Sequence, residues 1–172
     1  MDIVQYAAFG SNLHPLRLRA RTSSARLAGT AYLSDWSLRF HKRSVDNSGK
    51  CSIHEGSSGL YVAVYQMSAA DKQELDRIEG VGSGYTNGRI IVPKFGECAT
   101  YLAAETHIDE SLIPYDWYRE LVLLGCRELG FATDYVHEIE RLAVTQDPDP
   151  KRRDDNWKIV RELRDSPTHR VN

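Results

Sequence analysis

One carboxylate stands out because of where it falls in the sequence: Glu79, at the end of a helix expected over residues 69–79. Leu75 and Ile78 precede it by four and one residues, so Glu79 shares the apolar face of that helix. Burial disfavours a charged carboxylate, and the helix dipole opposes negative charge at this end by about 0.3–1 kcal/mol. Both effects suit a group that exchanges protons near neutral pH. The alternative is a side chain that reaches solvent at a frayed helix end, and composition alone favours that alternative.

A second candidate is the turn Gly10-Ser11-Asn12, which ends a strand expected over residues 3–9. Small residues after a strand leave backbone N–H groups free to face an anion or a developing oxyanion. Most glycine turns only reverse the chain, so this signal is weak by itself. The segment 80–88 holds four glycines, which favours mobility or close approach to a ligand. It lacks the patterns of dinucleotide and P-loop sites, which argues against a nucleotide ligand.

Other catalytic patterns are missing from the sequence. The six histidines have no HxxxH or HExxH spacing, no GxSxG motif occurs, and the three cysteines form no CxxC pair. We therefore expect no metal and no cofactor. A formal net charge of -2 argues against a nucleic-acid partner. No apolar run is long enough to cross a membrane and no leader peptide is recognisable, so we expect a cytoplasmic protein.

The elements that must position these residues follow from hydrophobic periodicity. Strands are predicted over residues 3–9, twice within 27–41, and over 59–67, 89–95 and 97–105. Helices are predicted over 69–79, 115–130 and 133–146, with a last short helix over 154–163, while 42–58 and 81–88 are predicted to be loops. Strands come first and helices mostly last, which is typical of an α+β fold. In the helix 69–79, Ser68 is the predicted N-cap and Gly80 the predicted C′ residue.

Taken together, these segments resemble the γ-glutamylcyclotransferase-like family, which includes the AIG2-like proteins. The matching stretches span residues 3–140 in the family's order: Tyr6 to Leu13 for the glycine-serine signature, Gly59 to Tyr65, Leu75 to Val81, Gly84-Tyr85 with Arg89 to Val92, and Tyr118 to Cys126. Their joint order and spacing carry the resemblance.

The resemblance implies a fold and its extent. The expected fold is a small, mostly antiparallel β-barrel flanked by helices, with a cavity at one end. The expected domain spans residues 1–146, and residues 147–172 form a charged C-terminal extension, packed on the domain or trailing from it.

The resemblance also implies a reaction. Such an enzyme, of acyltransferase or lyase type, converts the γ-glutamyl group of an amine or amino acid to 5-oxoproline, without a metal, and releases the amine. Glu79 would act as general acid and base. Tyr85 and Tyr118 would line the cavity or, alternatively, be amphipathic core residues. The substrate's carboxylate and carbonyl would be held, mainly by backbone N–H groups, along Tyr6, Ala7, Ala8, Phe9, Gly10, Ser11 and Asn12.

Two departures from the family pattern affect this interpretation. Phe9 replaces the usual tyrosine, which removes one hydroxyl group, and the spacing from Glu79 to Tyr85 is about one residue short. These two departures leave open a second hypothesis, in which the protein is catalytically silent and binds a small amino-acid-like metabolite. A third hypothesis is an interaction domain that uses the charged C-terminal helix. The sequence also leaves the oligomeric state open between monomer and homodimer.

Overall fold

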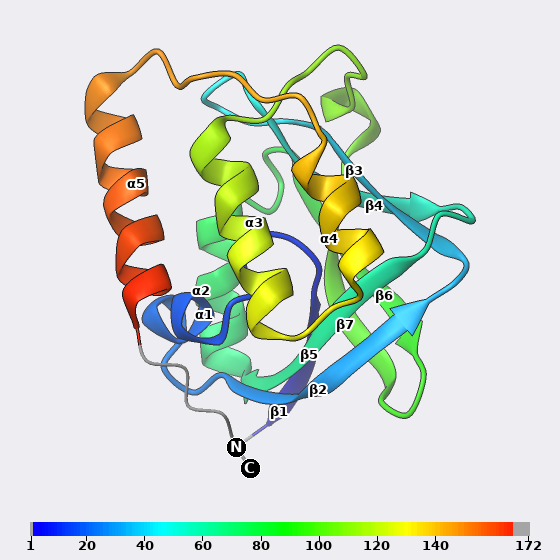
Figure 1. The fold of residues 1–172 in the computed structure, drawn as a ribbon. Coiled ribbons are helices and arrows are strands. Elements are labelled where there is room, and N and C mark those ends of the chain that lie inside the picture. Colours follow the sequence, from blue (N-terminus) through cyan, green and yellow to red (C-terminus); the bar gives the residue numbers. More distant parts are fainter. Residues whose placement is uncertain (1, 167–172) are drawn as a thin grey trace.

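The computed structural model describes residues 2–166 (Figure 1). Its strands are β1 (Ile3–Ala8), β2 (Arg26–Leu33), β3 (Trp36–Arg43), β4 (Gly49–Glu55), β5 (Leu60–Ser68), β6 (Tyr85–Val92) and β7 (Gly96–Ala103). Its helices are α1 (Pro15–Arg21), α2 (Ala69–Glu79), the short 3-10 helix η1 (Glu105–His107), α3 (Asp116–Glu128), α4 (Thr133–Glu140) and α5 (Pro150–Asp165). The predicted α+β class is confirmed. None of the helices in this part of the chain is long and apolar enough to cross a membrane.

The main sheet has five strands in the order β2-β5-β1-β7-β6, and β3 and β4 form a separate pair. β1 lies at its centre, antiparallel to β5 and parallel to β7, and the other pairings are antiparallel. Because β1 has a neighbour on each side, its last residues are fully enclosed and end at the turn Gly10-Ser11-Asn12. The central position of this strand places that turn inside the molecule.

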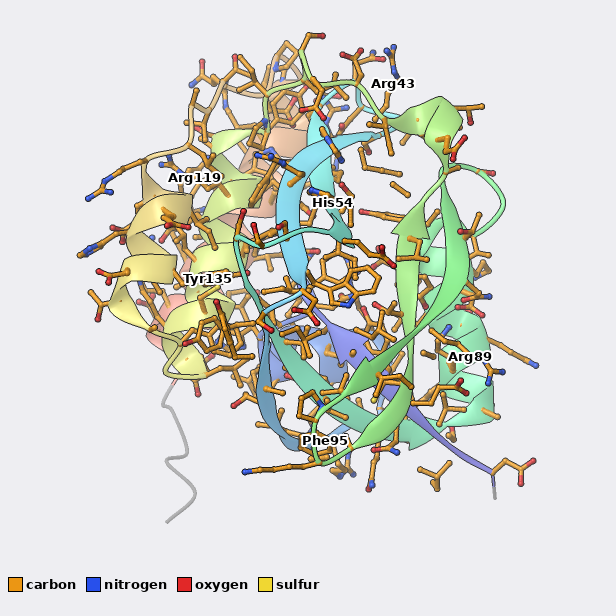
Figure 2. All side chains as sticks on the ribbon, turned by 90° about the vertical axis from the view of Figure 1, so that its right-hand side faces the viewer. Arg43, His54, Arg89, Phe95, Arg119 and Tyr135 are labelled. Atoms are coloured by element: carbon orange, nitrogen blue, oxygen red, sulfur yellow. The ribbon has the colours of Figure 1, made fainter. Side chains whose placement is uncertain are left out.

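The expected barrel is wrong, because both sheets are open. The edge strands β2 and β6 do not pair with each other. Instead the ring of Phe95, in the β6–β7 turn at the foot of the sheet in Figure 2, lies against β2. A Cβ atom on Gly29 of β2 would be only 2.8 Å from that ring. At the other end, a single bridge between Ser37 and Gly59 links β3 to the start of β5.

Two segments that were expected to be loops contain strands. β3 continues to Arg43 and β4 occupies Gly49–Glu55, within the serine-rich segment 42–58. Pairing with β3 buries Cys51 and Ser52, and Gly49 lies so close to the Phe40 carbonyl that any Cβ would collide with it. Similarly, β6 begins at Tyr85, inside the glycine-rich segment. Tertiary pairing overrides the weak strand propensity of these residues.

The helix that carries Glu79 is confirmed at both ends. The Ser68 side chain accepts a hydrogen bond from the Asp71 N–H at 3.2 Å, and Gly80 ends the helix in the left-handed conformation with φ of 70°. Leu75 is fully buried and anchors α2 to the core, whereas Ile78 is 37% exposed. The position of Glu79 is therefore fixed by local signals that the sequence contains.

The C-terminal helix α5 runs beside α3 (Figure 1). It begins at Pro150, four residues before the predicted start, because Asp149 caps it by accepting a hydrogen bond from the Arg152 N–H. Val160 is fully buried, and Trp157 and Leu163 pack on the core. That face of α5 is therefore not free to contact another protein. The end of the expected extension, residues 167–172, lies outside the described residues.

Candidate active site

A small pocket lies where β1 ends, and we call it the amide pocket. Its lining residues are Tyr6, Phe9, Gly10, Ser11, Asn12, Cys51, Glu79, Tyr85, Tyr101 and Tyr118. The structure thus brings Glu79, the glycine turn and both candidate tyrosines to one place. Ala7 and Ala8 are completely buried in β1 and do not line the pocket. Cys51 and Tyr101 were not predicted, since β4 was expected to be a loop and Tyr101 had no distinguishing motif.

Glu79 does not lie alone on an apolar face. Its side chain is 17% exposed, and its Oε1 atom accepts hydrogen bonds from Arg21 at 2.8 Å and from the Asn12 amide at 2.9 Å. The Asn12 carbonyl oxygen in turn accepts from Arg21 at 3.0 Å, which fixes the amide orientation because a guanidinium only donates. In residues 2–166, no hydrogen bond reaches Oε2 of Glu79. One carboxylate oxygen is therefore held in place and the other is available to a ligand.

Arg21 is a site residue that the sequence analysis missed. It lies at the end of α1, and Arg17 precedes it by one helical turn. That spacing, in a basic stretch directly after the glycine turn, is the signal that could have identified it. Its partner Glu79 is 58 residues away in the sequence, so the ion pair itself is visible only in the fold.

The pocket tyrosines differ in whether their hydroxyl protons are free. The Tyr118 oxygen accepts from the Cys51 N–H at 3.0 Å, and the Tyr6 oxygen accepts from the Asn12 amide at 3.3 Å, so both can still donate a proton. By contrast, Tyr85 donates to the Cys51 carbonyl, and Tyr101 donates to an Asp76 carboxylate oxygen at 2.8 Å.

Burial keeps these groups in their neutral, protonated forms. Burial raises the pKa of Tyr118, and burial together with the nearby Glu79 charge raises the pKa of Tyr6. Burial likewise raises the pKa of the Cys51 thiol well above its usual range, which argues against a thiolate nucleophile. The tyrosine hydroxyls are therefore protonated at neutral pH and can act as hydrogen-bond donors. Among the described residues that line the amide pocket, Glu79 is the only carboxylate.

The turn supplies further donors. In the described part of the chain, the backbone N–H groups of Gly10, Ser11 and Asn12 make no hydrogen bond. A Cβ atom on Gly10 would lie 2.9 Å from the Cys51 Cβ and 3.5 Å from the Tyr118 hydroxyl oxygen. A glycine is therefore needed where the turn passes β4. The free amides and the Tyr118 hydroxyl together form a set of donors suited to an oxyanion or a carboxylate.

A second, larger pocket adjoins the first, and we call it the basic pocket. It shares Ser11, Glu79, Tyr85 and Tyr118 with the amide pocket. Its other lining residues are Arg17, Arg21, Lys42, Ser44, Lys50, Ile78, Trp117 and Asn156. Four of them carry positive charge, and α5 contributes Asn156. Across residues 2–166, no cluster of three or more histidine, cysteine, aspartate or glutamate side chains is placed to hold a metal ion.

Known proteins resemble this chain in sequence and in fold. A sequence model of the AIG2-like family matches residues 59–139. The γ-glutamylcyclotransferase of Bos taurus is 28% identical over 145 residues, which cover 80% of this chain and 77% of the bovine protein. The Homo sapiens γ-glutamylcyclotransferase is 28% identical over 152 residues, with the same coverage.

A solved structure described as a γ-glutamyl cyclotransferase superimposes with a TM-score of 0.81 at 24% identity, and the match covers 94% of this chain and 99% of that one. At 24% identity, this similarity supports a shared fold and no more. The family model, the curated relatives and the shared fold agree in what they resemble: this chain is similar to the γ-glutamylcyclotransferase-like proteins.

Proposed function

We propose that the protein is a γ-glutamyl cyclotransferase. Such an enzyme converts the γ-glutamyl group of a γ-glutamyl amine or γ-glutamyl amino acid to 5-oxoproline and releases the free amine. The observation that carries the proposal is the amide pocket. There a tyrosine hydroxyl lies with a carboxylate oxygen and three backbone amides that have no hydrogen-bond partner among residues 2–166. The family relatives support the same chemistry, since curated γ-glutamylcyclotransferases align over 80% of the chain.

In the proposed reaction, the neutral α-amino nitrogen of the glutamyl group attacks its own γ-carbonyl carbon. Glu79 takes a proton from that nitrogen through Oε2, while Arg21 and Asn12 hold Oε1. Glu79 then gives the proton to the leaving nitrogen as the original amide C–N bond breaks. One C–N bond forms and one breaks, so the reaction balances without water, an oxidant or a reductant.

The pocket would lower the barrier in two further ways. The amides of Gly10 and Ser11 and the hydroxyl of Tyr118 would stabilise the negative oxygen of the tetrahedral intermediate, and one oxyanion-hole donor is typically worth about 10²–10³-fold in kcat. Holding the glutamyl chain folded brings the nitrogen to the carbonyl carbon, and such orientation can supply up to roughly 7–11 kcal/mol. Because all three cysteines are unpaired, we also propose a reducing, cytoplasmic location.

The direct test is release of 5-oxoproline from a panel of γ-glutamyl dipeptides and γ-glutamyl amines. The wild-type protein should form 5-oxoproline from at least one of them. Glu79→Gln keeps an oxygen that can accept from Arg21 and Asn12 but removes the base, so kcat should fall by about 10²–10⁴-fold. Glu74→Gln is the matched control, since Glu74 lies on the same helix, is 44% exposed, and within residues 2–166 pairs with Arg77 alone. Full activity in Glu79→Gln would exclude the proposed role of this carboxylate.

A catalytically silent protein is the second candidate, favoured by the position of Phe9. Phe9 lines the amide pocket and is 5% exposed, so the hydroxyl group that a tyrosine would carry at this position is absent from the site itself. In this case the pocket binds a small amino-acid-like metabolite without turnover. Calorimetry that shows binding of a γ-glutamyl compound, with no 5-oxoproline formed from any of the panel, would favour this candidate over the enzyme.

A further inference from the structure

The basic pocket holds more positive charge than its own protein partners neutralise. Arg21 pairs with Glu79 at 2.8 Å, and Lys50 pairs with Asp46 at 2.9 Å. Two cations that line the pocket remain, Arg17 and Lys42. The side chain of neither residue makes a hydrogen bond or an ion pair with any residue between 2 and 166.

These two side chains are also well buried. Arg17 is 9% exposed, and its Nε atom is completely buried without a partner. Lys42 is 6% exposed, and its Nζ atom lies 4.3 Å from the centroid of the Tyr85 ring. Burying a cation without a partner is costly, so such groups are normally paired. An anion in the pocket would supply the missing partners.

The titration behaviour of both groups agrees with this description. Burial, reinforced by the nearby charge of Arg21, lowers the pKa of Arg17 to about 10, which still leaves the guanidinium charged at neutral pH. Burial also lowers the pKa of Lys42, although the charges of Glu79 and Asp46 oppose that shift. A bound anion close to either group would favour its charged form.

The position of the basic pocket indicates which part of a ligand would enter it. It meets the amide pocket at Ser11, Glu79, Tyr85 and Tyr118. If the glutamyl group occupies the amide pocket, Glu79 lies between that group and the cations. The leaving amine, which receives its proton from Glu79, therefore extends toward Arg17 and Lys42.

We propose that the basic pocket selects leaving groups that carry two negative charges, such as the glutamate or aspartate of a γ-glutamyl dipeptide. This inference rests on the proposed function. Arg17, whose planar guanidinium suits a carboxylate, binds the α-carboxylate of the leaving amino acid, and Lys42 binds its side-chain carboxylate. Asn156 of α5 adds a polar group to the wall, which makes the C-terminal helix part of substrate recognition.

The test compares acidic dipeptides with their neutral isosteres: γ-glutamyl-glutamate with γ-glutamyl-glutamine, and γ-glutamyl-aspartate with γ-glutamyl-asparagine. Dissociation constants are measured by calorimetry on the Glu79→Gln protein, in which the proposed reaction is slowed. The acidic member of each pair should bind roughly ten- to a hundredfold more tightly, the range for one charge-assisted hydrogen bond. In Lys42→Gln, combined with Glu79→Gln, the preference should fall by about tenfold or more. Lys158→Gln is the matched control, because Lys158 is 71% exposed and does not line the pocket, and it should keep the preference.

The outcomes for recognition and for chemistry are separate. Equal dissociation constants within both pairs, or a preference that Lys42→Gln leaves intact, would overturn the inference, whether or not the wild-type protein forms 5-oxoproline. A strong acidic preference without any 5-oxoproline from the wild-type protein would support the inference about recognition and refute the proposed reaction. If the wild-type protein turns these dipeptides over, kcat/KM should show the same preference, and the preference should weaken as ionic strength rises.

Discussion

Tyr118 and Tyr85 offer a matched comparison, because both hydroxyl groups hydrogen-bond to the same peptide unit of Cys51. Tyr118 accepts from its N–H and Tyr85 donates to its carbonyl. Both side chains are buried, at 7% and 6% exposure. Replacing either with phenylalanine leaves one buried backbone group without its partner, while only Tyr118→Phe removes a hydroxyl proton that could reach a ligand.

The expected loss of stability is similar in the two variants, whereas the expected loss of kcat is not. An unsatisfied buried donor or acceptor costs about 1–3 kcal/mol of folding free energy, and for a chain of this size each kcal/mol lowers Tm by roughly 2–4 °C. We therefore expect both variants to melt a few degrees lower, by similar amounts. Loss of one oxyanion donor should lower kcat by about 10²–10³-fold in Tyr118→Phe, whereas Tyr85→Phe should lose less than about tenfold.

The assay is the 5-oxoproline progress curve at saturating substrate, measured well below the lower of the two melting temperatures. Differential scanning calorimetry on the same preparations provides the stability comparison. Equal losses of kcat in the two variants would refute the reasoning, since the two differ only in which partner uses the hydroxyl proton. A large loss of kcat in Tyr85→Phe alone would refute it as well.

Two other substitutions test the surroundings of the site. Gly10→Ala should lower kcat/KM by about tenfold or more, with little change in substrate specificity. Its Cβ would lie 2.9 Å from the Cys51 Cβ and would displace the turn that carries the free amides. Steady-state kinetics on the same substrate panel measure kcat/KM for both proteins. Asp147→Asn should destabilise the protein at pH 7 by about 1–3 kcal/mol, less than the 3–5 kcal/mol of a fully buried pair because Arg152 is 34% exposed. Burial alone would raise the pKa of Asp147, but the hydrogen bonds from Arg152, the Asp149 N–H and the Trp117 indole hold it below the ordinary value. The pair therefore stabilises the fold above about pH 4 and loses that effect as the pH falls further. Denaturation of both proteins across pH 2–7 should show their difference shrinking below about pH 4, and a difference that grows there would contradict the assignment.

The parts of the site that the sequence predicted are those encoded locally. Ser68, Gly80 and the periodicity between them define α2 and therefore the position of Glu79. The turn at Gly10 likewise follows directly from the end of a buried strand. Each depends on residues within about one helical turn of the feature, where capping and turn preferences act.

The parts that could not be predicted depend on contacts between distant residues. The strand β4 is rich in polar residues, and only its pairing with β3 and the close approach of Gly49 to Phe40 make it a strand. Cys51 enters the site for the same reason, because it lies on that strand. The barrel was wrong for a similar reason: closure depends on hydrogen bonds between edge strands, and the bulky Phe95 ring lies where one edge would have to approach β2.

The absence of a tyrosine at position 9 has a different consequence once the hydroxyl partners are known. Four tyrosines line the amide pocket, and the partner of each decides what it can offer a ligand. Tyr85 and Tyr101 donate to a carbonyl and a carboxylate of the protein, which can only accept. Tyr6 and Tyr118 accept from N–H groups, which can only donate, and so keep their protons. Because residue 9 is a phenylalanine, two of the aromatic residues that line this pocket, Tyr6 and Tyr118, have a hydroxyl proton to donate to a ligand. The cost in kcat of losing the Tyr118 hydroxyl should therefore be larger in this protein than in its Phe9→Tyr variant.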